Sequence, residues 1–180
     1  MDRLIEIEIE PWYMHELATS RGDEDTRSEV VLVLLRPRGK VLAISKAFYP
    51  PGTFRLPTGG IRPGETPQEA FLREVDEETG LSSEPIRTID TMVLRCKSGS
   101  ESLDITSYVI LGSPTSAPPE PNDLQEKITG YEEIDPAGLR EVGERLSNLQ
   151  GRWRSWGLFR APAHFVVADF LLREASGDET

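Results

Sequence analysis

Residues 59–81 have the sequence GGIRPGETPQEAFLREVDEETGL and predict the element around which the chain is organised. A helix is expected over residues 66–79, because threonine can cap its first turn and the proline that follows suits the first helical position. Glu69 completes a Thr-x-x-Glu capping box, which satisfies two backbone N–H groups at the helix start. Gly80 supplies the left-handed residue that ends the helix.

Four carboxylates crowd the end of this helix, at Glu74, Asp76, Glu77 and Glu78. Glu74 lies one turn from both Glu77 and Glu78, and each such pair costs roughly 0.2–0.5 kcal/mol. The helix dipole at this end favours cations instead. Mg²⁺ or Mn²⁺ would offset the repulsion, because both prefer carboxylate oxygens and complete their shell with phosphate. A solvated acidic helix face is the alternative interpretation.

The glycines that precede the helix let the backbone turn sharply and approach a ligand closely. Their carbonyls can face a metal ion, and their amides, that of Gly60 among them, can face phosphate oxygens. The loop and the helix together therefore predict a site for a metal ion and a phosphate group.

The spacing of these residues resembles the Nudix box, G-x5-E-x7-R-E-U-x-E-E-x-G-U, in which U is a bulky aliphatic residue. Gly59, Glu65, residues 73–78, Gly80 and Leu81 match every specified position. The preceding Leu56-Pro57 is similar to the family's usual lead into the box. The resemblance implies an α+β fold, a Nudix-type α/β/α sandwich with a mixed β-sheet. Strands first, an inserted helix, more strands and then helices agree with that architecture.

The resemblance also implies a role for each box residue. Glu74 and Glu78 resemble the principal metal ligands, Glu77 a further ligand directly or through water, and Gly59 or Gly60 a carbonyl ligand. Arg73 resembles the arginine that holds the glutamates by charge-assisted bonds, and Glu65 its acidic partner. Both are expected to orient the other residues.

The implied reaction is attack of a metal-activated water on one phosphorus of a P–O–P bridge. A carboxylate must accept the proton of that water. The resemblance leaves two sources open for this base, namely a box glutamate such as Glu77 or Glu74, or an acid on a later loop. The later candidates are Glu120, Asp123, Glu126, Glu132 and Glu133. We favour Glu126.

Outside the box, apolar periodicity and turn residues predict the remaining elements. Strands are expected at residues 5–9, 30–35, 40–45 and 131–134, a hairpin at 86–97 with 103–111, and helices from residue 135 and at 161–175. The strand at 5–9 has one wet face and is expected at a sheet edge. We expect one domain over residues 1–180, with an N-terminal strand and loop at 1–28 and a C-terminal helical extension at 151–180.

Composition excludes several classes of function. The net charge of -11 repels polyanions, so a nucleic-acid duplex is a poor partner. No stretch approaches the roughly 20 apolar residues of a membrane-spanning helix, and the N-terminus lacks the features of a signal peptide. We therefore expect a cytoplasmic protein with no membrane partner. The single cysteine, Cys96, is expected to be an ordinary strand residue.

The intact box favours an enzyme, a pyrophosphohydrolase acting on phosphorus-containing acid anhydrides. A catalytically silent nucleotide-binding regulator is the alternative, because a fold can keep its site and lose its chemistry. The expected substrate is a small nucleotide. A nucleoside diphosphate linked to a sugar or similar group, as in ADP-ribose, ranks first, a nucleoside triphosphate second and a dinucleoside polyphosphate third.

Residues near the box and in the tail carry weaker predictions. Arg55 is either a surface charge or a contact to phosphate or base. His15 and His164 are isolated and are expected at surface or core positions. The aromatic residues Trp153, Trp156 and Phe159 are expected to pack rather than to stack on a base. The strand at 5–9 and this aromatic segment could serve a homodimer interface.

Overall fold

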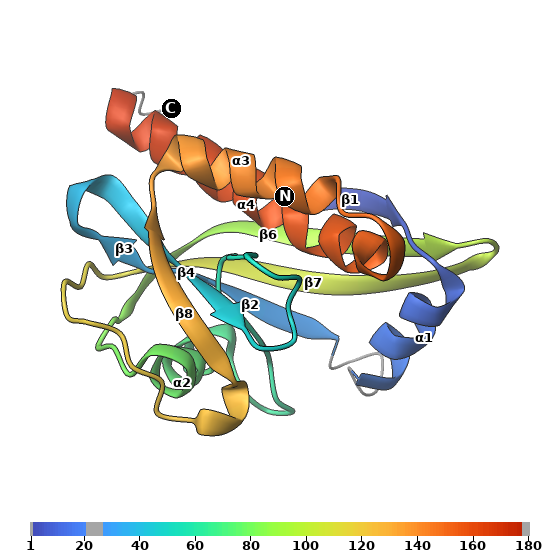
Figure 1. Ribbon diagram of the computed structural model, residues 1–180, viewed down its shortest axis with the longest axis horizontal. Coiled ribbons are helices and arrows are strands. Elements are labelled where there is room, and N and C mark those ends of the chain that lie inside the picture. The colour runs from blue at the N-terminus through green and yellow to red at the C-terminus, as the bar shows by residue number, and fades with distance from the viewer. Residues whose placement is uncertain (1, 21–26, 178–180) are drawn as a thin grey trace.

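The computed structural model describes residues 2–20 and 27–177 of the chain. Helices flank a layer of strands on both sides, with α3 and α4 along one face and α2 on the other (Figure 1). The helices are α1 (Pro11–Ser20), α2 (Pro67–Thr79), α3 (Pro136–Ser147) and α4 (Arg154–Ser176). The expected α/β/α sandwich with a C-terminal helix is confirmed.

The strand layer consists of a five-stranded sheet, in the order β1-β6-β7-β2-β5, and a three-stranded sheet, in the order β3-β4-β8. The strands are β1 (Arg3–Glu8), β2 (Ser28–Val33), β3 (Leu35–Arg36), β4 (Lys40–Lys46), β5 (Thr58–Gly60), β6 (Pro85–Ser98), β7 (Glu101–Gly112) and β8 (Ile128–Ile134). Strand β1 runs parallel to β6, and β2 runs parallel to β7. Antiparallel pairs join β6 to β7 and β2 to β5. The larger sheet is therefore mixed, as expected.

Strand β2 is buried on both faces, which explains its continuous apolar sequence. Val31 and Val33 pack into the cluster that faces α3 and α4. Val30 and Leu32 point the other way and pack with Phe71 of α2, because successive strand residues alternate between faces. The sheet thus holds the box helix against a dry core.

Several elements differ from the sequence-based expectation. The strand predicted at 30–35 divides into β2 and β3, which belong to different sheets, and an unbroken apolar run cannot show where a strand changes partners. Helix α1 was not predicted. Helix α4 begins at Arg154 rather than at residue 161, and Pro162 lies inside it. Residues 1 and 21–26 of the predicted N-terminal strand and loop at 1–28, and residues 178–180 of the extension, lie outside the described residues.

The remaining strand predictions hold. The hairpin of β6 and β7 forms, and β1 lies at an edge of the larger sheet. Cys96 is a buried strand residue on β6.

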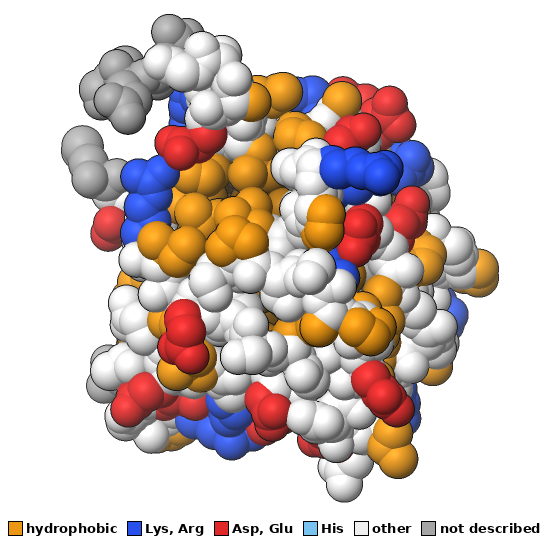
Figure 2. Space-filling view, turned by 90° about the vertical axis from the view of Figure 1, so that its left-hand side faces the viewer, with side chains coloured by type: hydrophobic (Ala, Val, Ile, Leu, Met, Phe, Trp, Pro, Cys, Tyr) orange, Lys and Arg blue, Asp and Glu red, His pale blue; other side chains and the backbone are white. Residues whose placement is uncertain are grey.

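Apolar side chains also reach the surface. A group of hydrophobic side chains shows on the face that carries the end of α4 (Figure 2). The exposed large hydrophobic residues include Ile86 on β6 and Leu172 on α4. The homodimer stays a prediction. No helix within the described part of the chain combines the length and the apolar character needed to cross a bilayer.

Candidate active site

The box helix begins and ends as its sequence predicts. The Thr66 hydroxyl accepts a hydrogen bond from the Glu69 backbone N–H at 3.2 Å, and the Glu69 carboxylate accepts one from the Thr66 N–H at 2.8 Å. Gly80 ends the helix with φ of 58°. These caps fix which turn of α2 faces the preceding loop.

Arg73 joins the box loop to the carboxylates of α2. Its Nε and Nη2 contact the two oxygens of Glu65 at 2.7 and 2.9 Å. Its Nη1 contacts Glu74 at 2.5 Å and Glu77 at 3.0 Å, and its Nη2 donates to the Gly60 carbonyl at 2.8 Å. Hydrogen bonds from Arg73 hold the pKa of Glu65 below its usual value. A single guanidinium therefore sets the relative positions of three glutamates.

Gly59 and Glu74 are in direct contact. A Cβ atom built on Gly59 would lie 1.8 Å from Glu74 Cδ and 2.1 Å from its Oε1, so only glycine leaves room for this carboxylate. Glu74 is 6% exposed. Its burial raises its pKa to about 7, although Arg73 acts in the opposite direction. The box turn thus closes over a carboxylate that is short of solvent.

Glu78 is the most deeply buried carboxylate of the site, with a side chain 0% exposed. The Lys46 ammonium lies 2.6 Å from Glu78 Oε1 and 2.5 Å from Glu126 Oε2. The pKa of Glu78 is raised above its usual value, because the effect of burial outweighs the attraction of Lys46. Burial also acts to lower the pKa of Lys46, but the attraction of Glu78 and Glu126 outweighs it and the pKa is raised. Lys46 therefore bridges the helix and the segment before β8.

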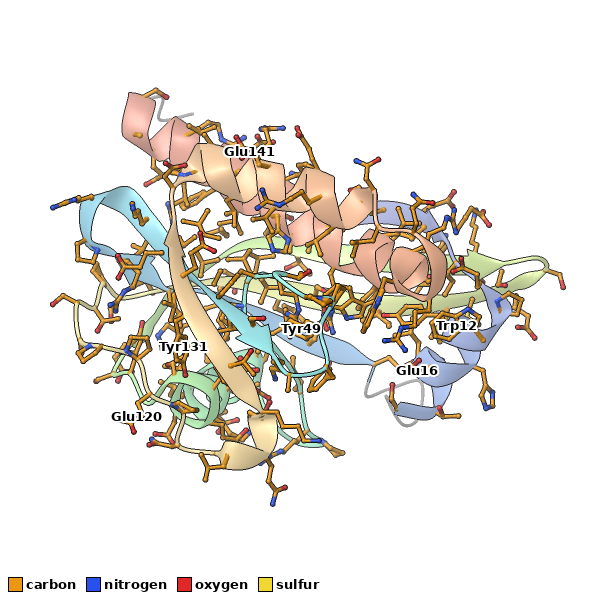
Figure 3. All side chains as sticks on the ribbon, in the orientation of Figure 1. Trp12, Glu16, Tyr49, Glu120, Tyr131 and Glu141 are labelled. Carbon is orange, nitrogen blue, oxygen red and sulfur yellow. The ribbon has the colours of Figure 1, made fainter. Side chains whose placement is uncertain are left out.

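The last carbonyls of α2 are satisfied by the segment that carries Glu126. The N–H groups of Glu120 and Asp123 donate to the carbonyls of Thr79 and Glu77 at 2.9 and 3.0 Å. The Tyr131 hydroxyl donates to the Glu78 carbonyl at 2.6 Å. Glu120 and Tyr131 both lie beside α2 (Figure 3). These bonds supply partners that a helix end lacks by itself and dock the later segment onto the box.

The loop before the box is held by α4. His164 Nε2 accepts a hydrogen bond from the Leu56 N–H at 3.0 Å, so Nδ1 carries the proton and donates to the Arg160 carbonyl, also at 3.0 Å. Burial, reinforced by the charge of Arg55, lowers the pKa of His164 to about 3. The ring is therefore a neutral link between the C-terminal helix and the residues that lead into Gly59.

Arg55 is not a surface charge, because it is only 4% exposed. Its Nη1 donates to the Leu56 carbonyl at 2.7 Å and to the Thr58 hydroxyl at 3.0 Å. Its guanidinium lies 4.8 Å from the Tyr49 ring centroid and 5.9 Å from that of Trp156. The packing role expected for Trp156 thus includes a contact with this arginine.

The structure brings some predicted residues together and separates others. Glu65, Arg73, Glu74 and Glu77 form one cluster, which Gly59 and Gly60 adjoin, and Lys46 connects Glu78 to Glu126. The alternative bases Glu132 and Glu133 are exposed on β8, where Glu133 pairs with Arg36 at 2.8 Å.

Sequence reasoning missed Lys46 and Tyr131 and treated His164 as isolated. Their partners are far away along the chain, and no local pattern marks Tyr131 or His164. The predicted strand at 40–45 stopped one residue before Lys46, so the end of the apolar run was the one available signal.

The residues of the site fit a hard divalent cation. In the described ranges, no three Asp, Glu, His or Cys side chains are grouped so that they could hold a metal ion, and the glutamates contact Arg73 and Lys46 instead. The donors are nevertheless oxygens, which Mg²⁺ and Mn²⁺ prefer. Glu78 Oε2 is buried without a hydrogen-bond partner among the described residues. Such an atom is costly unless a cation approaches it.

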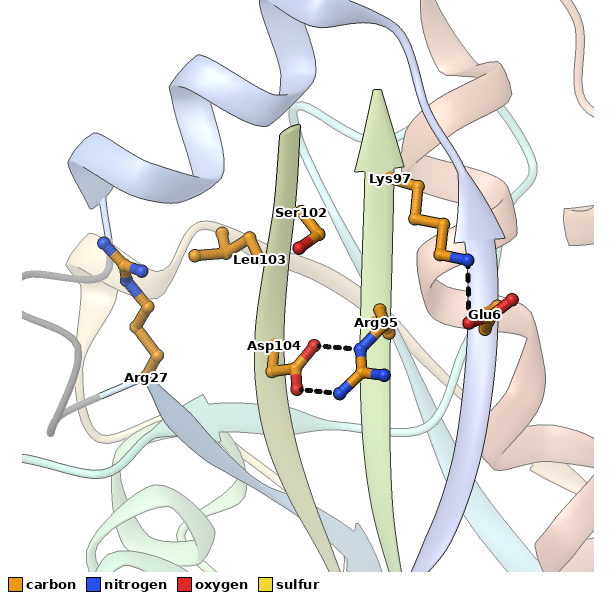
Figure 4. A pocket seen from close by; sticks show the side chains of 7 residues that line it. All are labelled: Glu6, Arg27, Arg95, Lys97, Ser102, Leu103 and Asp104. Carbon is orange, nitrogen blue, oxygen red and sulfur yellow. Dashed lines mark hydrogen bonds and ion pairs between the residues drawn. The ribbon is translucent and has the colours of Figure 1, made fainter. Parts of the chain in front are cut away.

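A hollow of about 560 Å³ lies elsewhere, over β1, β6 and β7 (Figure 4). Its charged side chains are largely paired with one another. Arg95 binds Asp104 through two contacts of 2.9 and 2.8 Å, and Lys97 lies 2.7 Å from Glu6. The hollow contains no box residue, so the candidate site remains the one around α2.

Comparison with known proteins gives a consistent picture. Residues 25–154 match the family model of the NUDIX domain. An RNA pyrophosphohydrolase of Yersinia enterocolitica is 37% identical over 67 residues, which are 37% of this chain and 37% of that protein. The matched segment thus spans little more than a third of the curated relative.

Solved structures share the fold at low sequence identity. A UDP-X diphosphatase has a TM-score of 0.58 at 14% identity, covering 93% of this chain and 71% of that one. The Escherichia coli dihydroneopterin triphosphate pyrophosphohydrolase has a TM-score of 0.53 at 18% identity, covering 78% and 95%. An ADP-ribose pyrophosphatase of Streptococcus suis has a TM-score of 0.51 at 17% identity, covering 85% and 93%.

Proposed function

The chain belongs to the Nudix family, and we propose that it is a metal-dependent pyrophosphohydrolase that cleaves a P–O–P bond in a nucleotide. The observation that carries the proposal is the buried Glu78 carboxylate, one oxygen of which lacks a hydrogen-bond partner among the described residues. Burying an acid in this way is costly, and a bound divalent cation would offset that cost.

Each box residue has a task in this proposal. Glu74 and Glu78 are the ligands of Mg²⁺ or Mn²⁺, with Glu77 and the Gly59 carbonyl as further ligands. When bound, the cation supplies Lewis acidity and lowers the pKa of a coordinated water. Arg73 fixes Glu74 and Glu77 relative to the loop, and Glu65 anchors Arg73 through two contacts of 2.7 and 2.9 Å.

We assign the general base to Glu126. Its side chain is 27% exposed, so it can reach solvent, and Lys46 holds it beside the box glutamate Glu78. The alternative Glu133 is engaged by Arg36 on another part of the sheet. Arg55 is buried beside the rings of Tyr49 and Trp156. We therefore propose that it fixes the backbone before Gly59 and does not contact the substrate.

We propose a small nucleotide as the substrate and keep the order of candidates expected from the sequence. A nucleoside diphosphate linked to a sugar or similar group comes first, a nucleoside triphosphate second and a dinucleoside polyphosphate third. The names of the similar proteins refer to RNA, ADP-ribose, UDP-X and dihydroneopterin triphosphate. A single-stranded RNA with a 5′-triphosphate therefore joins the set to be tested.

The test is a panel of these substrates, assayed for release of phosphate, diphosphate or nucleoside monophosphate with Mg²⁺ and with Mn²⁺. Glu78→Gln and Glu126→Gln should remain folded and lose turnover, the latter by roughly 10²–10⁴-fold if it removes a general base. Glu133→Gln is the matched control and should keep wild-type turnover. Tight nucleotide binding by the wild type without turnover of any substrate would favour the regulator instead.

A further inference from the structure

Lys46 is the last residue of β4, and its placement depends on an irregularity in the sheet. The pairing of β4 with β8 shifts register between Ser45 and Lys46, which pair with Gly130 and Ile128. Such bulges are common beside active sites, where they redirect a side chain. Here the redirected side chain ends between two carboxylates of different elements.

The Lys46 ammonium is a compact cation in a buried position. Its side chain is 8% exposed, and the carboxylate of Glu78 beside it is 0% exposed. Charges this deep are tolerated only when they are paired. Lysine presents a point charge without the two-pronged geometry of arginine, so a carboxylate can exchange it for another compact cation with little rearrangement.

Two different cations can therefore pair with the Glu78 carboxylate. One is the Lys46 ammonium, 2.6 Å from Oε1. The other is the divalent cation that the proposed function requires at the same carboxylate. The contact between Lys46 and Glu78 stabilises the metal-free protein. Because a metal ion must displace this contact in order to bind Glu78, the contact lowers the affinity for the metal ion.

We propose that Lys46 is a positioning residue that competes with the divalent cation for Glu78 and retains Glu126 when the cation is bound. The inference rests on the proposed function and deepens it by naming how this site sets its metal requirement. Lys46 keeps the buried glutamate compensated in the absence of metal. Its contact of 2.5 Å with Glu126 then keeps the base beside the box.

The first experiment measures Mn²⁺ affinity without substrate, from the electron paramagnetic resonance signal of the free ion, at mildly alkaline pH. Lys46→Met should bind Mn²⁺ roughly tenfold more tightly than the wild type. A change of this size is typical when two groups compete for one site. Lys46→Arg keeps the positive charge and should therefore not bind Mn²⁺ more tightly than the wild type. Lys97→Met is the matched control, since Lys97 pairs with the exposed Glu6 and lies on β6. Unchanged or weaker Mn²⁺ binding by Lys46→Met overturns the proposal.

The second experiment compares thermal unfolding with chelator and with Mn²⁺. Lys46→Met should melt lower than the wild type in chelator, because Glu78 is left buried and unpaired, and Mn²⁺ should recover most of the difference. An equal loss in both conditions would indicate ordinary packing damage and would count against the proposal.

A third measurement uses the wild type and does not depend on any variant folding. Acetylation of Lys46, quantified by mass spectrometry relative to that of Lys97, should increase severalfold when Mg²⁺ is added. Equal labelling with and without Mg²⁺ contradicts displacement of the ammonium.

Steady-state kinetics separate positioning from substrate binding. Lys46→Met should lower kcat, because Glu126 loses the ion pair that positions it. KM should stay within about threefold of the wild-type value. A large rise in KM with unchanged kcat would make Lys46 a substrate contact instead and would overturn the proposal. The metal measurements need no turnover, so tighter Mn²⁺ binding in a chain that hydrolyses nothing would refute the proposed function alone.

Discussion

Replacing Gly59 with alanine tests whether metal binding and turnover depend on the close contact between the box turn and Glu74. The added Cβ would lie 1.8, 2.1 and 2.2 Å from Glu74 Cδ, Oε1 and Cγ, so the carboxylate must move. Glu74 is a flexible side chain, which limits the stability cost to roughly 1–3 kcal/mol, as for other overpacked positions. That cost corresponds to a decrease in Tm of roughly 2–12 °C for a chain of this size.

The larger effect should fall on metal binding and turnover. Moving Glu74 away from the turn separates two of the proposed ligand groups, and disturbances of this kind typically cost 10–100-fold in affinity or activity. Gly60→Ala is the matched control for thermal unfolding only, because a Cβ there meets nothing within 4 Å. Mn²⁺ titration, turnover and thermal unfolding of both variants complete the test. A Gly59→Ala variant that binds Mn²⁺ and turns over substrate like the wild type would refute the reasoning.

Two further predictions concern stability. Since the pKa of His164 is lowered to about 3 from 6.5 by burial, the unfolded chain binds more protons between these values, and stability should fall by up to about 1.4 kcal/mol per unit as the pH falls from 6.5 towards 3. His164→Gln, which keeps an acceptor for the Leu56 N–H, should show a flatter dependence in denaturant titrations, and an unchanged slope would contradict the assignment. Tyr131→Phe removes the donor to the Glu78 carbonyl, 2.6 Å away, and should cost about 1–2 kcal/mol in urea unfolding; a change within experimental error would show that water replaces the hydroxyl.

The box helix and its neighbours could be predicted because their signals are local. A capping threonine, a proline and a terminal glycine act within one turn of the helix, so the sequence predicts α2 within a residue. The same holds for the contact of Arg73 with Glu65, since fixed spacing along a loop and a helix brings these residues together. The hairpin of β6 and β7 also follows from adjacent apolar strands and a short turn.

Other features depend on residues that are distant in sequence. Helix α4 starts at Arg154, seven residues before the apolar run from which it was predicted. The burial of Arg55 depends on Trp156, about 100 positions later, which no local pattern could reveal. The division of the apolar run into β2 and β3 depends on which neighbouring strands were available.

The sequence by itself determined the family, the box helix and the carboxylates of the site, because these depend on spacing along one segment of backbone. Only the tertiary structure decided that Lys46 lies between Glu78 and Glu126 and that His164 holds the loop before Gly59. Those contacts join residues 32 to 108 positions apart. They form because a charge or polar group buried in a shared core is stable only where nearby partners compensate it.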